Sequence, residues 1–452
     1  MKINKLFGVL AFSLISSSVM AAVSKEEAAQ LGKSLTPLGA ERAGNAAGTI
    51  PEWTGGLQPN AGKVDSLGFL ENPYAEDKPL FVITAQNVDQ YKDNLSPGQV
   101  AMFKRYPETY RIPVYPTRRS ATVPESVQRA ARQNAENTSL VEGGNGLENY
   151  RIAHAFPIPK NGMEVVWNHI TRYRGGSLRR QIVQASPQVN GSYSLVYFQD
   201  EFVYPESFKD YDPNKTYGVL AYFKQRVTAP SRLAGNVLLV HETVNQVKEP
   251  RLAWLYNAGQ RRVRRAPQVA YDGPGTASDG MRTSDNLDMF NGALDRYDWK
   301  LNGKKELYIG YNNYDLDNPK NKYADILKAG HINQDLTRYE LHRVWHVTAT
   351  LKQGERHIYA KRDFFIDEDS WQAAVIDQYD GRGNLWRVSE AQTEFFYHVG
   401  LTNYALEAIY DLQAGRYLAL GMRNEEKKGV DYGFTASEND FTPAALRQAG
   451  VR

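Results

Sequence analysis

Two histidines and one acidic turn have the residue types that bind metal ions. His342 and His346 stand four residues apart in a run that alternates like a β-strand, where this spacing separates the rings by about 13 Å, too far for one ion. Asp367, Glu368 and Asp369 offer oxygen ligands for a hard cation, but a short acidic turn is more often simply solvated. We therefore expect no metal site, a structural role for both histidines and a solvated acidic turn.

Motifs of common hydrolases and nucleotide-binding enzymes do not occur in the sequence. There is no Gly-x-Ser-x-Gly elbow, no His-Glu-x-x-His pair, no glycine-rich phosphate loop ending in Lys-Ser or Lys-Thr, and no cysteine. A carboxylate pair for glycoside hydrolysis stays an option, because such a pair forms in space and leaves no sequence spacing. We expect a protein that is not an enzyme and uses no cofactor.

The densest charge feature is a run of four arginines, Arg261, Arg262, Arg264 and Arg265. On a strand, the outer two face one side and the inner two the other, so they cannot form a single flat patch. One pair could bind an anionic headgroup or the lip of a cavity through the bidentate geometry of guanidinium. The interpretation that we favour is ion pairing with nearby acids. The candidate acids are Asp285, Asp288, Asp295 and Asp298.

Aromatic side chains are the other candidates for a binding role. The chain has 28 tyrosines, 17 phenylalanines and 7 tryptophans, enough to line a cavity. The candidates for contact with an apolar ligand are Trp167, Phe198, Tyr222, Trp254 and Trp345. Each of them also suits an ordinary hydrophobic core, which is the commoner role of a buried aromatic residue.

The N-terminus has the three parts of a secretory signal peptide, which we assign to residues 1–21. Lys2 and Lys5 supply positive charge, an almost uninterrupted apolar run follows, and small residues precede the cleavage point. We expect a mature chain that begins at Ala22 or Val23. No later apolar run reaches the ~20 residues that span a bilayer, so we expect a soluble periplasmic protein.

The composition limits which partners the chain could bind and which interactions could stabilise its fold. Without Lys2 and Lys5, 52 basic side chains stand against 51 acidic ones, a balance that does not favour nucleic acid as a partner. The absence of cysteine excludes disulfides and a lipid-modified cysteine after the cleavage point. A mature chain of this length can bury a large core without them.

Two regions follow the signal peptide. Residues 22–149 predict an N-terminal arm and helices, with a capping box at Ser24 and Glu27. Residues 150–452 predict a curved β-sheet body with covering insertions. The insertions are residues 273–292 and 312–335, which are long enough to cover an opening of the sheet.

Strands are predicted in the second region by runs that alternate with a period of two. The clearest runs are 163–173, 192–204, 217–227, 237–247, 338–351, 357–366, 371–379 and 385–390. Ten or more strands favour a strongly curved antiparallel sheet, an incomplete barrel, over a flat sheet. Runs 163–173 and 192–204 carry apolar residues on both faces, so one face should pack on protein and the other line a semi-apolar concavity.

Several short sequence words carry a family resemblance by their order along nearly the whole mature chain. They are TPLGAE at 36–41, GTIPEWTGG at 48–56, RRVRRAP at 261–267, YDWKL at 297–301, RYELHRVW at 338–345 and DEDSW at 367–371. In these words the chain resembles a proteobacterial family of unknown function described as outer-membrane lipoprotein-sorting-like. The resemblance implies the fold of the lipoprotein carriers LolA and LolB, mainly β with α, in which a curved antiparallel sheet wraps around helices and encloses an apolar cavity.

The residues and the resemblance together predict a periplasmic carrier or binding protein for lipids or other hydrophobic molecules. The resemblance also implies work with an exporter of the resistance-nodulation-division class and with outer-membrane components, in the periplasm or peripheral to the outer membrane. The alternative is a periplasmic carbohydrate-active enzyme or glycan-binding module, which would need a carboxylate pair at a cleft.

Overall fold

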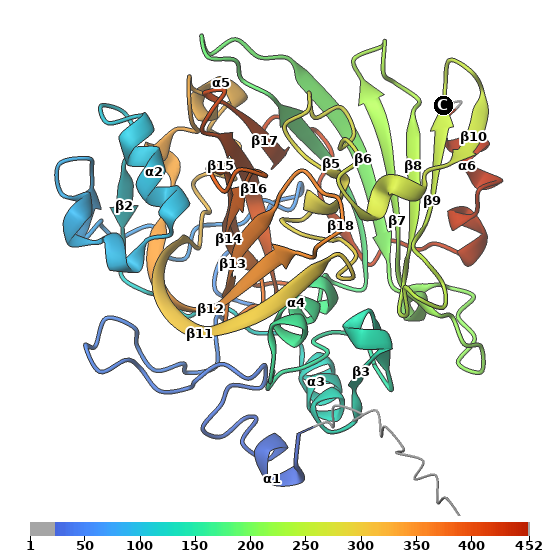
Figure 1. The fold of residues 1–452 in the computed structure, drawn as a ribbon, viewed down its shortest axis with the longest axis horizontal. Coiled ribbons are helices and arrows are strands. Elements are labelled where there is room, and N and C mark those ends of the chain that lie inside the picture. The colour runs from blue at the N-terminus through green and yellow to red at the C-terminus, as the bar shows by residue number, and fades with distance from the viewer. Residues whose placement is uncertain (1–22, 451–452) are drawn as a thin grey trace, which may run out of the picture.

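The computed structural model describes residues 23–450, so the predicted signal peptide lies outside the described residues. Within this range, no helix combines the length and the apolar composition needed to cross a membrane. Most regular structure is β, and short helices lie around it (Figure 1).

One large sheet organises the molecule, and it contains sixteen of the strands found in residues 23–450. In spatial order its main path is β1 (Phe81–Ile83), β2 (Ile112–Val114), β12 (Tyr339–Leu351), β13 (Lys361–Asp367), β14 (Ala373–Tyr379), β15 (Leu385–Phe396), β16 (Leu401–Asp411), β17 (Arg416–Met422), β5 (Ser177–Ala185), β6 (Leu195–Val203), β7 (Val219–Ala229), β8 (Val237–Thr243), β9 (Leu252–Asn257) and β10 (Arg262–Arg265). Beside this path lie β11 (Tyr297–Gly310), paired with β12, and β18 (Asp431–Tyr432), paired with β5. A separate hairpin joins β3 (Ser139–Val141) and β4 (Gly146–Glu148).

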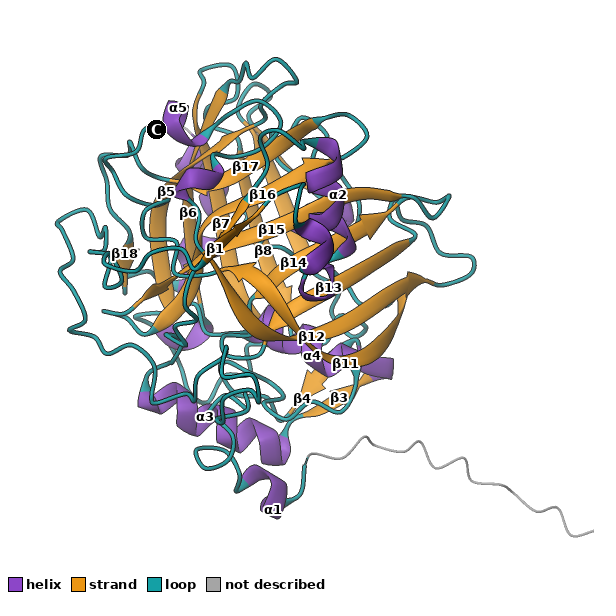
Figure 2. Ribbon diagram, turned by 90° about the vertical axis from the view of Figure 1, so that its left-hand side faces the viewer, coloured by secondary structure: helices purple, strands orange, loops and turns teal. Residues whose placement is uncertain are grey.

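The sheet is antiparallel except where β2 meets β12. Among the described strands, β10 pairs only with β9, so the sheet stays open while it curves around an interior (Figure 2). Bulges within the β13–β14, β14–β15 and β15–β16 pairs increase the local bend. The predicted fold class, mainly β with a strongly curved antiparallel sheet, is confirmed.

The helices in the described chain are short. They are α1 (Lys25–Ala28), α2 (Pro97–Arg105), α3 (Glu125–Asn137), α4 (Gly162–Thr171), α5 (Tyr323–Ile326) and α6 (Ala445–Gly450). At α1, the Ser24 hydroxyl accepts a hydrogen bond from Glu27 N at 3.1 Å, and the Glu27 carboxylate accepts one from Ser24 N at 2.8 Å. The predicted capping box is therefore present.

The strand predicted at residues 163–173 is wrong, because this segment forms helix α4. Asn161 caps it, and its side-chain oxygen accepts a hydrogen bond from Glu164 N at 3.0 Å. Almost every residue of α4 is buried, so all sides of the helix are enclosed by protein and no polar face reveals the helical period. In such a short buried run, periodicity cannot separate a helix from a strand.

Two hydrophobic clusters cover the two faces of β12–β17. On one face, Met102 and Phe103 of α2 pack with Phe365 and Val375 of the sheet. Residues 312–335 lie on this same side through buried Tyr323, Ile326 and Ile332. On the other face, Val166 and Trp167 of α4 pack with Phe364 and Ile376. These strands are therefore covered by protein on both faces.

Residues 273–292 lie on the α4 side of the sheet, inside its curve. Arg387 of β15 donates from Nη1 to Met281 O at 2.9 Å, and Arg362 of β13 lies with Nη1 3.0 Å from Asp285 Oδ2. Met281 also packs against Ile409 of β16. The segment is thus anchored on one half of the sheet and stands opposite the other half, β5–β8.

Candidate functional site

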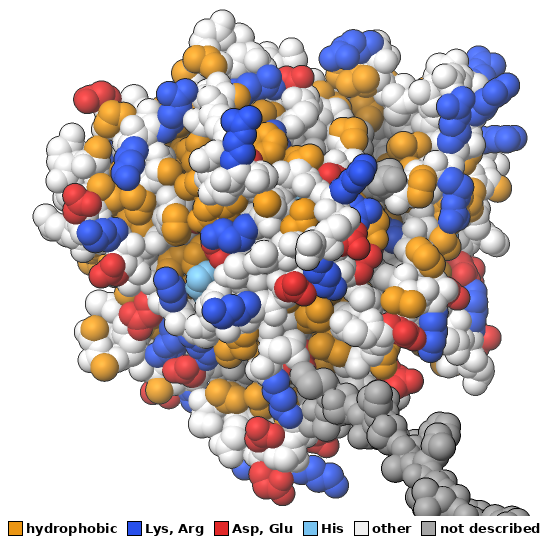
Figure 3. Space-filling model, in the orientation of Figure 1, with side chains coloured by type: hydrophobic (Ala, Val, Ile, Leu, Met, Phe, Trp, Pro, Cys, Tyr) orange, Lys and Arg blue, Asp and Glu red, His pale blue; other side chains and the backbone are white. Residues whose placement is uncertain are grey.

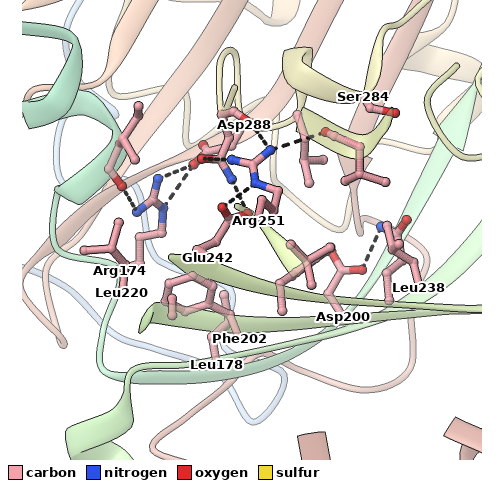
Figure 4. Close-up of a pocket in the computed structure, with 18 of the residues that line it drawn as sticks. Arg174, Leu178, Asp200, Phe202, Leu220, Leu238, Glu242, Arg251, Ser284 and Asp288 are labelled. Atoms are coloured by element: carbon pink, nitrogen blue, oxygen red, sulfur yellow. Dashed lines mark hydrogen bonds and ion pairs between the residues drawn. The ribbon is translucent and has the colours of Figure 1, made fainter. Parts of the chain in front are cut away.

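A cavity lies between the concave face of β5–β8 and residues 273–292. The end of α4 and parts of β16 and β17 also line it, and Figure 4 shows part of its wall. The space measures about 1260 Å³, part of it open to solvent. Apolar side chains make up most of its wall, with a few charged groups among them, as in many sites for small ligands.

An apolar row crosses the concave face of the four strands. Leu178 is paired with Phe202, Phe202 with Phe223, and Phe223 with Val240. Side chains paired in this way on one face lie about 5 Å apart, so the four form a continuous stripe. Phe202 and Phe223 are only half-buried although they line the interior cavity. The two rings therefore border open space.

A polar row lies beside the apolar row, two residues along each strand. It pairs Arg180 with Asp200 and Asp200 with Gln225. Arg180 Nη2 lies 3.5 Å from Asp200 Oδ2 and donates to Tyr404 Oη at 2.8 Å, and Gln225 Nε2 donates to Asp200 Oδ1 at 2.9 Å. Burial raises the pKa of Asp200, and the guanidinium of Arg180 acts in the opposite direction.

Two further acids of the cavity wall are each held by arginine (Figure 4). Arg251 Nε lies 2.6 Å from Glu242 Oε2, and Arg174 Nη2 lies 2.7 Å from Asp288 Oδ2. Asp288 also pairs with Arg172. Burial alone would raise the pKa of Asp288, but the two guanidinium groups outweigh burial and hold it well below its usual range.

The five predicted aromatic residues do not gather around this cavity, and none of them is among the side chains that line it. Phe198 lies on the same face of β6 as the cavity-lining residues, and it packs there with Ile182 and Leu420. Tyr222 and Trp254 belong to a cluster with Leu446 of α6. Their part in ligand binding stays a prediction.

The two remaining tryptophans lie in the core beside α4. Trp167 is buried, and its Nε1 donates to Gly144 O at 2.9 Å. Trp345 stacks on Trp371 with ring centroids 6.2 Å apart. Trp167 therefore stands on a helix and not on the strand wall that the sequence predicted.

The arginine run is exposed on the edge strand β10 and in the turn before it. Figure 3 shows Lys and Arg side chains gathered where Figure 1 places β10. Arg265 lies over the ring of Trp254, with Cζ 5.1 Å from the centroid. Nothing in residues 23–450 forms an ion pair with Arg261, Arg262, Arg264 or Arg265.

The ion pairs expected for these arginines are therefore absent from the described chain, because the acids have other neighbours. Asp285 binds Arg362 and His357, and Asp288 binds Arg172 and Arg174. Asp295 accepts a hydrogen bond from Tyr271 Oη at 2.9 Å. Asp298 is exposed on β11.

The acidic turn at residues 367–369 is buried, which corrects the expectation of a solvated turn. Asp367, Glu368 and Asp369 are 1%, 2% and 4% exposed. Arg119 binds Asp369 through two hydrogen bonds of 2.9 and 2.7 Å, and Lys304 Nζ lies 2.7 Å from Glu368 Oε2. The acidic turn is therefore bound to the N-terminal segment by ion pairs and is not solvated.

His342 joins this turn, with ligand-type atoms of His342, Asp367 and Asp369 all within 4.8 Å of one another. His342 Nε2 lies 3.0 Å from Glu340 Oε2. Burial lowers the pKa of His342, but Asp369, Glu340 and Asp367 outweigh burial and raise it to about 9. The imidazole is then protonated at neutral pH and belongs to a charge network with these carboxylates.

Sequence reasoning missed the residues that form the cavity. Strand β5 was not predicted, although Leu178, Arg180 and Ile182 alternate with Arg179 and Gln181 as expected for its inward face. Arg282 lies in the insertion that the sequence marked as a cover, yet no local pattern distinguishes it. The apolar row and the polar row form only when β5 pairs with β6, which places Leu178 beside Phe202 and Arg180 beside Asp200.

The fold and this cavity define a class of protein: an open, curved antiparallel sheet with an internal cavity. The chain belongs to the family whose model is described as "Protein of unknown function (DUF1329)", which matches residues 82–447. The family predicted from the sequence words is thereby confirmed. The chain is 74% identical over 445 residues to the uncharacterized protein PA3922 of Pseudomonas aeruginosa, covering 98% of each chain.

Two solved structures share parts of the architecture. One is a domain from Vibrio parahaemolyticus described as an outer membrane lipoprotein-sorting protein, 14% identical, with a TM-score of 0.44 over 63% of this chain and 98% of the other. The second is the LolA superfamily protein NE2245 from Nitrosomonas europaea, 10% identical, with a TM-score of 0.38 over 63% of this chain and 98% of the other.

Proposed function

We propose that the protein is a periplasmic binding protein or carrier for a lipid-like molecule, which it holds in the cavity of β5–β8 without transforming it. The observation that carries this proposal is the apolar row, in which Phe202 and Phe223 stay half-buried beside open space inside the molecule. Contact between apolar surface and water is unfavourable, and a bound apolar ligand would remove this contact.

The state of the cavity acids supports binding over hydrolysis. Glycoside hydrolysis needs one carboxyl group as acid and another as base or nucleophile. Among the residues that line the cavity, Asp200, Glu242 and Asp288 each pair with an arginine. Such pairing occupies the carboxylate oxygens with hydrogen bonds to protein groups, so we place the carbohydrate-active alternative second.

The cellular part of the proposal rests on the N-terminus and on the family resemblance. The signal peptide directs the chain to the periplasm. A carrier there would exchange its ligand with an exporter of the resistance-nodulation-division class and with outer-membrane components, at the membrane surface or in solution.

The experiment is a titration of the mature protein with an environment-sensitive fluorescent fatty acid. We expect saturable binding with a rise in emission. Phe202→Asp should weaken binding at least tenfold, because an uncompensated charge in an apolar wall costs about 2 kcal/mol or more. Leu255→Asp is the control, since Leu255 is 42% exposed on β9 and does not line the cavity.

Absence of saturable binding to fatty acids, phospholipids and lysolipids would contradict the proposal. Equal weakening by both aspartate variants would also contradict it, because the effect would then not come from the cavity. Circular dichroism of each variant checks that the fold is retained.

A further inference from the structure

Arg282 is a cavity-lining guanidinium that has no acid partner. It is 5% exposed, and no carboxylate in the described part of the chain lies within 4.0 Å of it. Its side chain makes one long hydrogen bond, from Nη1 to Thr283 O at 3.5 Å, and Nε has no partner. A buried charge is unfavourable unless an opposite charge neutralises it.

The acids whose charge reaches Arg282 are already engaged or uncharged. Asp200 is paired with Arg180, and Asp285 with Arg362. Glu407 is fully buried, and burial raises its pKa to about 8, so it is mostly protonated at pH 7. Burial likewise lowers the pKa of Arg282, as expected for a cation without a counter-charge.

The backbone at Gly275 lies close against the Arg282 guanidinium. A Cβ added at Gly275 would lie 2.8 Å from Arg282 Cζ, 3.0 Å from Nη2 and 3.1 Å from Nε. The glycine therefore leaves room for the group to lie against the chain, and both residues line the cavity. A planar guanidinium is suited to bind a carboxylate or a phosphate through two parallel hydrogen bonds.

The charges of the whole cavity wall agree with an incoming anion. Four guanidinium groups line it, and three carboxylates stand against them. The guanidinium groups are those of Arg174, Arg180, Arg251 and Arg282, and the carboxylates those of Asp200, Glu242 and Asp288. One acidic headgroup would balance the lining charges, and Arg172 behind the wall, paired with Asp288, adds further positive charge.

We propose that Arg282 binds the headgroup of the ligand, which makes the ligand an anionic amphiphile with a carboxylate or phosphate on an apolar chain. This inference rests on the proposed function. The apolar chain lies along the row of Leu178, Phe202 and Phe223. The headgroup lies toward the polar row, because the segment that carries Arg282 is bound to β5 on the far side of Arg180 from Leu178, where Gln184 Nε2 donates to Ala277 O at 2.7 Å.

The test compares a dansylated undecanoic acid with its methyl ester, which has the same chain and fluorophore but no charge. Wild-type protein should bind the acid at least tenfold more tightly than the ester. Arg282→Met should bind both equally, whereas Arg282→Lys should keep part of the preference. Arg382→Met, in the exposed turn between β14 and β15, removes the same charge elsewhere and should leave the preference unchanged.

Competition then separates the two headgroups. Lauric acid and dodecyl phosphate should displace the dansylated acid at lower concentration than dodecanol, and their order tells carboxylate from phosphate. Inorganic phosphate alone should not displace it, because it lacks the chain. The melting temperature of ligand-free Arg282→Met should not fall, since the change removes an unpaired buried charge.

Four results would overturn the inference. If acid and ester bind wild-type protein equally, the headgroup inference fails and the carrier proposal stands. If Arg282→Met keeps the preference, Arg282 is not the group that recognises the anion. If inorganic phosphate alone displaces the probe, the site binds a free anion. If neither probe binds, the proposed function fails together with the inference.

Discussion

His342 shows how a single residue can report on the charge network around the acidic turn. Its folded-state pKa of about 9 lies above the ordinary value of 6.5. The protonated form is therefore favoured by folding, and this stabilisation is fully present below pH 6.5 and is lost as the pH rises through 9.

We predict that His342→Gln removes this pH dependence. The difference in unfolding free energy between wild type and variant should shrink from pH 6 to pH 9.5, by about 3 kcal/mol at 1.36 kcal/mol per pKa unit. Urea denaturation at several pH values measures it. Burial raises the pKa of Asp367 to about 6, so it titrates at the acid end of this window and not in the part between pH 7.5 and 9.5. Parallel pH profiles for the two proteins would contradict the assignment.

The exposed arginines of β10 give a second prediction at the residue scale. Because nothing in the described chain pairs with Arg262 and Arg264, changing both to Gln should alter stability by no more than about 0.5 kcal/mol. If they meet anionic headgroups, binding to vesicles that contain phosphatidylglycerol should fall roughly thirtyfold, at about 1 kcal/mol per arginine for the two arginines. Co-sedimentation with charged and neutral vesicles measures this, with Arg382→Gln as control.

The competing interpretation of these arginines is protection of an open sheet edge, since charged side chains discourage pairing with another chain. In that case the double variant should self-associate in light scattering, and vesicle binding should be unchanged. The two outcomes cannot be confused.

At the scale of elements, helix α2 is positioned on the sheet by the residue at its second position. Gly98 N donates to Asp377 Oδ2 at 2.9 Å, and Ser96 Oγ donates to Asp377 Oδ1 at 3.0 Å. A Cβ on Gly98 would lie 2.1 Å from Asp377 Oδ1 and 2.6 Å from Val388 Cγ2. The helix can approach the sheet this closely only because the residue is glycine.

We predict that Gly98→Ala destabilises the protein by about 1–3 kcal/mol, although alanine is the better helix former. Gly381→Ala is the matched control, because no atom lies within 4 Å of its added Cβ, and it should change stability by less than about 0.5 kcal/mol. Thermal denaturation of both variants decides the matter. A Gly98→Ala protein as stable as wild type would show that α2 does not dock as described.

Elements marked by capping or turn residues could be predicted from the sequence. Elements without such residues or a clear polar face could not. The capping box at Ser24 and the turn at 380–384 mark their elements by local chemistry, and both are present. Helix α4 is enclosed by other parts of the chain, and strand β5 carries polar side chains on both faces, so neither shows a clean pattern. The cavity depends on both, which is why its residues could not be read from the sequence.

At the scale of the whole molecule, the sheet is one continuous structure with two differently covered halves. Strands β12–β17 have protein on both faces, whereas β5–β8 face residues 273–292 across the cavity. The sequence predicted a curved sheet and two covering insertions. It could not show that residues 312–335 cover the outer face while residues 273–292 stand inside the curve, because that depends on the direction of curvature.

The absence of cysteine allows this arrangement to be tested with single thiols. Leu238 is half-buried, lines the cavity and belongs to the row of Gln225, whereas Leu255, its Cα partner on β9, is exposed outside the cavity. We predict that a bound fatty acid slows maleimide labelling of Leu238→Cys at least fivefold and leaves Leu255→Cys unchanged. At a ligand concentration of 100 times Kd, the free fraction is about one per cent, so protection should be nearly complete if the ligand fills the cavity. Protection of neither thiol, despite saturable binding, would place the ligand elsewhere on the molecule.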